Sequence, residues 1–175
     1  MFTIAAVVVV ILIAVVLGLA ASKPNTFRVQ RATSIQAPPE KIFPFISDFH
    51  GWTSWSPWER IDPAMKRTYG GAEKGKGAIY EWEGNNKVGK GRMEITGTNP
   101  PGSVTIKLDF IKPFEGHNVA EFTIEPRGNA TDVTWAMYGP NRFISKLFQT
   151  FMNMDNMIGK QFEAGLANLK GIAEK

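Results

Sequence analysis

The side chains that could supply chemistry in this chain are few and scattered. Its two histidines, His50 and His117, lie far apart, and it contains no cysteine. The spacing that zinc sites need is therefore missing, and we predict no metal and no other cofactor. No serine stands in a nucleophile-elbow motif. The glycines from Gly70 to Gly77 lack the Lys-Ser/Thr ending of a phosphate loop, so we interpret them as hairpin turns.

Three carboxylates remain as candidates. Glu81 and Glu83 would share one face of a strand, as paired acid/base groups can, but Glu83 precedes a turn and a solvent-facing pair is the simpler interpretation. Asp155 is different because it interrupts an apolar stripe. On an ideal helix it lies about 20° from Phe162 and about 40° from Phe151, so we expect it to face the interior.

A carboxylate in that position is costly to bury, which leaves three explanations open. Asp155 could pair with a polar group such as a sheet arginine or a tryptophan N–H. It could face trapped water in a polar part of a pocket. Alternatively, the helix is kinked or begins later, so that Asp155 becomes a cap. If it does face inward, its expected role is to orient a ligand in an otherwise apolar pocket.

The segment that positions Asp155 is the last part of the chain, from Arg142 to Glu174. Its apolar residues fall within roughly 90° of one another on a helical wheel: Ile144, Phe148, Phe151, Ile158, Phe162, Leu166 and Leu169. We predict one long amphipathic helix of roughly eight or nine turns.

The first residues are of another kind, because Phe2 to Ala21 is an unbroken apolar run. At about 1.5 Å per residue it spans roughly 30 Å, the thickness of a bilayer core. A cleaved signal peptide is the alternative, with Ala20-Ala21-Ser22 as its cleavage site. The run is long for a signal peptide, however, and no Lys or Arg precedes it. We predict an anchor over residues 1–22, a linker over 23–26 and one domain over 27–175.

The charge distribution suggests where this domain lies. All charged side chains follow residue 22, and the net charge is only +4. That value suits proximity to anionic lipid, and no basic block indicates nucleic acid as a partner. Lys23, Arg28 and Arg31 follow the anchor, so the positive-inside rule predicts a single-pass protein of the inner (plasma) membrane with its domain in the cytoplasm.

The middle of the chain reads as strands separated by turn residues. After a first strand near residues 26–36, Pro38-Pro39 opens a short helix. A tryptophan-rich stretch from Phe49 to Trp58 follows, which we interpret as a short helix or turn that plugs the core. Six more strands are predicted at Lys66–Tyr69, Ala78–Glu83, Gly91–Thr98, Ser103–Ile111, Asn118–Glu125 and Asp132–Tyr138.

These strands alternate apolar and polar residues, so one face of an antiparallel sheet must be covered, and the C-terminal helix is the surface that can cover it. If the two surfaces do not fill the space between them, the gap is a ligand pocket. Its expected lining is Asp155, Phe151, Phe148, Phe162, Trp135, Met137, Phe122, Phe110, Met93, Tyr80, Trp82 and Trp55. Each of these side chains could equally be ordinary core.

The order of elements resembles the START-like helix-grip superfamily (SRPBCC), and within it the bacterial group described as polyketide cyclase/dehydrase and lipid transport. The residues that carry the resemblance run from Ile35 to Glu40, from Trp52 to Glu59, from Tyr80 to Asn85, from Val133 to Met137 and from Gly165 to Lys170. The resemblance implies an α+β helix-grip fold: a curved antiparallel sheet of about seven strands wrapped on a long C-terminal helix.

Three functions follow as hypotheses. The first is a membrane-anchored carrier that binds a small hydrophobic ligand or lipid between sheet and helix. The second is a cyclase/dehydratase-like enzyme that uses Asp155, Tyr80 or a glutamate as acid/base. The third is an interaction protein with a filled core. Enzymatic work would need at least two converging ionisable groups, and the sequence places only Asp155.

Overall fold

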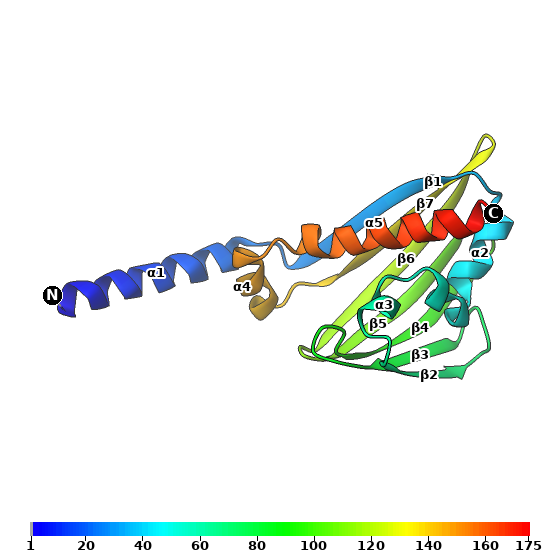
Figure 1. Ribbon diagram of the computed structural model, residues 1–175. Coiled ribbons are helices and arrows are strands. Elements are labelled where there is room, and N and C mark those ends of the chain that lie inside the picture. Colours follow the sequence, from blue (N-terminus) through cyan, green and yellow to red (C-terminus); the bar gives the residue numbers. More distant parts are fainter. Residues whose placement is uncertain (1) are drawn as a thin grey trace.

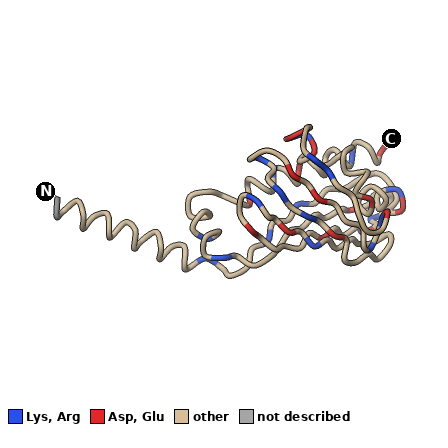
Figure 2. The backbone as a smooth tube through the Cα atoms, turned by 90° about the horizontal axis from the view of Figure 1, so that it is seen from below, with Lys and Arg blue, Asp and Glu red and all other residues tan. Residues whose placement is uncertain are grey.

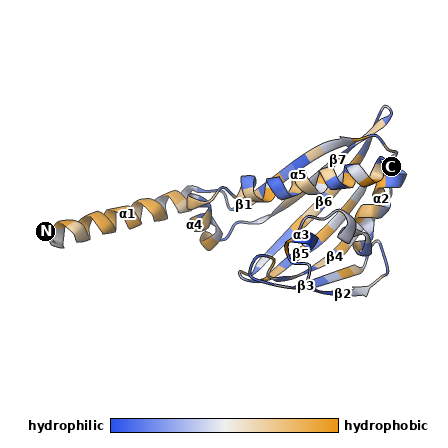
Figure 3. Ribbon diagram, in the orientation of Figure 1, coloured by the Kyte–Doolittle hydropathy of each residue, from blue (hydrophilic) through white to orange (hydrophobic). Residues whose placement is uncertain are grey.

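The computed structural model describes residues 2–175, and it shows a long N-terminal helix that projects from a sheet-and-helix domain (Figure 1). This helix, α1 (Phe2–Ser22), is long and apolar enough to cross a membrane, although a signal sequence would meet the same test. It carries no charged residue along its length, whereas Lys and Arg stand where it joins the domain (Figure 2). The described part of α1 is hydrophobic on all sides (Figure 3).

The domain is built on one antiparallel sheet of seven strands in the order β1-β7-β6-β5-β4-β3-β2. Consecutive strands from β2 to β7 are neighbours, as the alternation of strands and turn residues predicts, and β1 joins the meander by pairing along β7. The strands are β1 (Thr26–Ile35), β2 (Lys66–Gly71), β3 (Ala78–Glu83), β4 (Lys90–Asn99), β5 (Ser103–Lys112), β6 (Gly116–Arg127) and β7 (Ala130–Pro140).

Helices cover the concave face of the sheet (Figure 1). The C-terminal helix α5 (Met154–Ala173) runs along β1, and α2 (Pro39–Ser47) crosses near β5 and β6. Pro44 stays within α2 without dividing it. The 3₁₀ helix η1 (Phe49–Ser54) and the single turn α3 (Trp58–Ile61) form the predicted tryptophan-rich plug.

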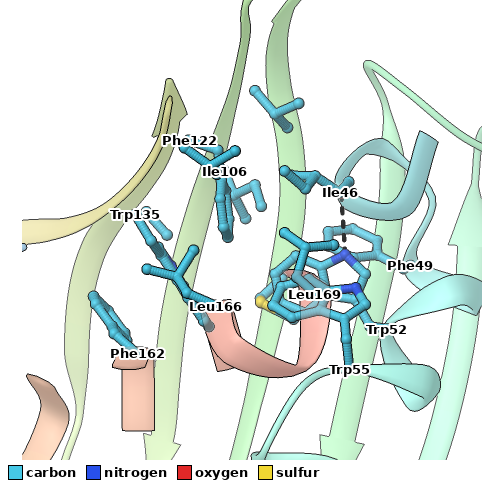
Figure 4. Close-up of a cluster of buried hydrophobic side chains, with 14 of the residues drawn as sticks. Ile46, Phe49, Trp52, Trp55, Ile106, Phe122, Trp135, Phe162, Leu166 and Leu169 are labelled. Atoms are coloured by element: carbon cyan, nitrogen blue, oxygen red, sulfur yellow. Dashed lines mark hydrogen bonds between the residues drawn. The ribbon is translucent and has the colours of Figure 1, made fainter. Parts of the chain in front are cut away.

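Aromatic rings fill the space between α5 and the sheet (Figure 4). Phe162 of α5 stacks on Trp135 of β7, with 4.2 Å between ring centroids and 6° between planes. Trp52 donates its indole N–H to the Ile46 carbonyl at 3.0 Å, and Trp55 donates to the Phe45 carbonyl at 2.9 Å. These hydrogen bonds let the two indoles be buried without leaving a polar atom unpaired.

The fold class predicted from the sequence is confirmed, but the single long C-terminal helix is wrong. The chain forms two helices, α4 (Phe143–Phe151) and α5, with Met152 and Asn153 between them. Asn153 caps α5, since its side-chain oxygen accepts from the Asn156 backbone N–H at 3.0 Å. An asparagine is stabilising at such a helix start, whereas it is unfavourable within a helix, so the helix restarts there.

Candidate functional site

A groove of about 630 Å³ opens at the end of the domain that joins α1. Three segments line it: residues 23–24 and 26–29, Asn141, and residues 149–155 around the α4–α5 break. Its volume lies within the range of small-molecule sites. The break in the C-terminal helix therefore forms part of this groove, which a continuous helix would not do.

Hydrogen bonds fix the walls of the groove. The backbone N–H of Asn141 donates to the Asn25 carbonyl at 2.7 Å, and its side-chain amide donates to the Pro24 carbonyl at 3.0 Å. Lys146, although buried, reaches Asn25 Oδ1 with its Nζ at 2.6 Å. Gln149 and Asn141 also join their side chains, at 2.9 Å. The segment that follows α1 is thus tied to α4.

The groove combines apolar and charged side chains. Phe27, Phe151 and Met154 are among its apolar residues, Lys23 is its cation, and Arg28 lines it without turning its guanidinium toward it. The Arg28 guanidinium donates to Gln30 Oε1 and lies 5.1 Å from the centroid of the Tyr138 ring. Such a lining suits a molecule with an apolar body and an anionic group.

Asp155 lines the rim of this groove and does not face the sheet interior, so that prediction is wrong. Its side chain is 55% exposed and pairs with Arg31 of β1, with 2.9 Å between Oδ2 and Nη2. Two of the open explanations hold together: the helix starts later, at Met154, and the partner is a sheet arginine. The hydrogen bond from Arg31 holds the pKa of Asp155 below its usual range. A carboxylate is also favourable in the first turn of a helix.

Arg31 is shared between two acidic residues of α5. Its Nε donates to Glu163 Oε1 at 2.7 Å, while its other nitrogens reach Asp155. Hydrogen bonds to Asp155 and then Glu163 raise the pKa of the guanidinium. Gly159 makes room for it, because a Cβ at that position would lie 2.0 Å from Arg31 Nη2. The arginine therefore ties the start of α5 to the outer strand of the sheet.

The other predicted lining residues lie elsewhere. Phe148 is exposed on α4, next to Phe114 with 5.2 Å between ring centroids. The remaining nine are core residues, of which Phe110 is partly buried: Phe162, Trp135, Met137, Phe122, Met93, Tyr80, Trp82, Trp55 and Phe110. Only Phe151 and Asp155 meet at the groove. Contact of the core residues with a ligand stays a prediction.

One polar atom in that core lacks a partner among the described residues. The indole N–H of Trp135 is buried and finds no acceptor there. A buried donor left unpaired costs about 1–3 kcal/mol. An acceptor supplied by water or by a bound molecule would remove that cost.

A buried polar network that the sequence does not reveal lies near η1 and α3. Glu59 accepts from Tyr80 Oη and, at 2.6 Å, from Arg67 Nε. Burial and the hydrogen bond to Glu59 raise the pKa of Tyr80. Sequence distance hides this group, since Glu59 and Tyr80 are brought together only by the packing of α3 on the sheet. These three side chains hydrogen-bond to one another and do not line the groove.

The other residues that the sequence analysis considered as candidates have structural roles. Glu83 pairs with Lys90 at 2.9 Å and Glu81 lies 3.6 Å from Arg92, both on the exposed face. The glycines around Gly71 form the β2–β3 turn, where Gly71 has φ 68° and a Cβ would lie 2.1 Å from the Gly77 carbonyl oxygen. Beside this turn, His50 stacks on Tyr69 at the edge of a smaller hollow of about 180 Å³.

Comparison with known proteins agrees with this architecture. The family described as "Polyketide cyclase / dehydrase and lipid transport" matches residues 26–174. Among curated protein sequences no match is found. A structure of protein CV1439 from Chromobacterium violaceum aligns with a TM-score of 0.60 at 16% identity, covering 87% of this chain and 99% of that one.

Two further structures are similar in fold. Major latex-like protein 151 from Panax ginseng aligns with a TM-score of 0.59 at 14% identity, over 87% of this chain and 100% of its own. The Aha1 dimer from Colwellia psychrerythraea aligns with a TM-score of 0.58 at 18% identity, over 85% and 96%. At such identities the likeness establishes the helix-grip fold alone. From residue 26 to residue 174, this chain belongs to the polyketide cyclase/dehydrase and lipid transport family of the START-like (SRPBCC) superfamily.

Proposed function

We propose that the protein is a membrane-anchored START-like domain that binds a small hydrophobic ligand or lipid. The observation that carries the proposal is the position of the 630 Å³ groove, at the end of the domain where α1 emerges. With α1 in a bilayer, this groove opens beside the lipid headgroups. A lipid would then enter without crossing bulk water.

The composition of the groove favours an amphipathic molecule. Phe27, Met152 and Met154 offer apolar contact, and methionine adapts to varied shapes. Lys23, the first residue after α1, offers charge to an anionic headgroup. The sequence-based hypothesis placed the ligand between sheet and helix, where the tryptophan cluster lies, and the groove is the site that we propose in its place.

The anchor is the second part of the proposal. We propose that α1 is retained and that the domain lies in the cytoplasm, because Lys23, Arg28 and Arg31 follow the apolar helix closely. Alkaline carbonate should leave the full chain in the membrane fraction. Release of the chain, or a mature protein that begins near Lys23, would contradict retention. A C-terminal reporter active only outside the cytoplasm would reverse the orientation.

Ligand binding is tested with two tryptophan substitutions of the same kind. Met154 lines the groove, whereas Met157, one turn further, is exposed and outside it. We expect Met154→Trp to reduce the lipid that co-purifies with the full chain in mild detergent, measured by native mass spectrometry and lipid extraction. Met157→Trp should retain it. Equal retention in both variants would contradict binding in this groove.

Among the described residues that line the groove, no two free ionisable groups converge as an acid/base enzyme would require. Asp155 is the carboxylate that lines the groove, and it is paired with Arg31. Glu59 and Tyr80 hydrogen-bond each other inside the domain. General acid/base work needs groups that reach a substrate, so the geometry favours binding over catalysis.

A further inference from the structure

Helix α4 is amphipathic, but its apolar face points away from the protein and its polar face packs against it. Its apolar residues Phe143, Ile144, Phe148 and Phe151 fall within roughly 140° on a wheel, and all are exposed. Phe151 is 72% exposed and Phe143 is 51% exposed. In a soluble protein this stripe would face the core. Figure 3 shows α4 as an orange segment beside the end of α1.

The polar face of α4 is the one held against the protein. Lys146 is buried and bonded to Asn25, and Gln149 is bonded to Asn141. Turning the apolar stripe inward would break both of these hydrogen bonds. The outward orientation of the stripe is therefore fixed by the contacts of the opposite face.

A second apolar element extends the surface. The end of β5 exposes Ile111, the turn that follows it exposes Phe114, and the Phe114 ring packs beside Phe148. Exposed cations stand at the same end of the domain: Lys112 precedes this turn, and Arg142, whose Nη1 lies 3.9 Å from Glu115 Oε2, precedes α4. Contiguous apolar surface bordered by cations is the composition of a surface that binds anionic membranes.

The anchor sets the depth of this surface. Helix α1 contacts α4, and Ala20 in its last turns is fully buried while Leu12 and Leu19 are exposed. If α1 spans the bilayer, residues near Ala20 lie close to one boundary of its hydrocarbon layer, because the 21 residues of α1 measure roughly 31 Å. An interfacial helix is buried about 5–10 Å at that boundary.

We propose that α4, together with the Phe114 turn, lies in the interface of the anionic bilayer that α1 crosses. The domain then has two contacts with one membrane, the spanning helix and the interfacial surface. This inference rests on the anchor of the proposed function. It adds that the groove is held at headgroup level by the apolar face of α4.

The absence of cysteine allows single labels to be placed at chosen sites. Three variants of the full chain, Leu12→Cys, Phe151→Cys and Asn129→Cys, carry a fluorophore in nanodiscs of phosphatidylcholine and phosphatidylglycerol. Leu12 lies in the middle of α1, and Asn129 lies in the exposed β6–β7 turn at the far end of the sheet. Each label is tested with iodide and with lipids that carry a nitroxide near the headgroup or deep in the acyl chain.

We expect the Phe151 label to be quenched by the shallow nitroxide and shielded from iodide. The Leu12 label should respond to the deep nitroxide, and the Asn129 label to iodide alone. In nanodiscs of phosphatidylcholine only, shallow quenching at position 151 should fall, because the cations lose their anionic partners. Unchanged quenching there would overturn the assignment of anionic lipid.

Different results would overturn the interfacial position of α4 and the membrane-spanning position of α1. A Phe151 label open to iodide, with the Leu12 label still quenched by deep nitroxide, would overturn the interfacial helix and leave the anchor standing. A Leu12 label that no lipid quenches would overturn the anchor itself. If unlabelled Phe151→Cys chains instead form disulfide-linked pairs, and separately labelled chains are shielded from both quenchers, the occupant of the surface is a second copy and the membrane inference is wrong.

Discussion

At the scale of single residues, Phe162 and Trp135 join the C-terminal helix to the sheet. Phe162 is 2% exposed and its ring is nearly parallel to the indole. We expect Phe162→Ala to lower the free energy of unfolding by roughly 3–5 kcal/mol, because it leaves a cavity in a packed core. Denaturant unfolding of the full chain in detergent measures this.

Phe148→Ala is the matched control, since the same truncation falls on an exposed ring outside the tryptophan cluster. Its loss should be distinctly smaller. If the two variants lose similar stability, the core does not carry the contact between helix and sheet as described.

His117 is the residue with the clearest expected pH dependence. Hydrogen bonds to Asp109 and then to Glu115 raise the pKa of its imidazole. Its contribution to stability is therefore fully present below about pH 6.5, the pKa of an unfolded histidine, and is lost as pH rises through the higher folded pKa. NMR titration of the ring should give a midpoint above about 6.5.

Asp109→Asn removes the nearer carboxylate, at 2.7 Å from His117 Nδ1, and should move that midpoint down while Glu115 still holds it in part. A midpoint that does not respond would show that the contact with Asp109 does not persist in solution.

Asp155 shows how far sequence reasoning reaches for one residue. The apolar stripe of the predicted C-terminal helix showed that a carboxylate at this position is out of place. A sheet arginine as partner and a later helix start were both among the open explanations. What the stripe could not reveal was Arg31 as the partner, because that contact joins residues 124 positions apart. The groove was missed for the same reason, since its walls come from both ends of the chain.

At the scale of elements, the strands were predictable and the helix break was not. Period-2 alternation identifies strands locally, and each predicted strand overlaps an observed one. The helical spacing of apolar residues continues without a shift from α4 into α5, so the periodicity predicted a single helix. The local signal was Asn153, a residue that favours helix starts. The stripe continues across the break, but its first part faces outward.

The glycines of α5 provide a matched pair at this scale. A Cβ on Gly165 would lie 2.8 Å from the Trp135 ring and 3.1 Å from Pro57 Cδ, whereas one on Gly171 would meet nothing within 4 Å. We expect Gly165→Ala to lower the free energy of unfolding by about 1–3 kcal/mol, because the added methyl group overpacks the contact. Gly171→Ala should stabilise by up to about 1 kcal/mol through helix propensity.

Thermal and denaturant unfolding of both variants measure the difference. A stabilising Gly165→Ala would show that α5 stands further from β7 than the structure places it.

At the scale of the whole molecule, the order of elements sufficed for the fold. Any fold of this chain must cover the apolar face of a long antiparallel sheet. Few topologies do so with one C-terminal helix. The core lies between the sheet and the helices that cover it, and α1 meets the domain mainly at α4, so residues 23–175 should fold without α1. We expect a cooperative transition with a free energy of unfolding of about 5–15 kcal/mol.

Circular dichroism during thermal unfolding of residues 23–175 tests that expectation. A broad, non-cooperative loss of signal would mean that the contact between α1 and α4 is needed for the domain to fold. In detergent-free buffer, the exposed stripe of α4 should also make this fragment self-associate.

The short connection between α1 and β1 limits how far the domain can move. Only Lys23, Pro24 and Asn25 separate the two elements, a span of roughly 10 Å even when extended. Asn141 and Lys146 hold Pro24 and Asn25 in place. With α1 in a bilayer, as we propose, a domain tethered in this way cannot shuttle a cargo between distant membranes as one on a long flexible tether can. A ligand of the groove would then be exchanged with the adjoining bilayer or handed to a protein that comes to the membrane surface.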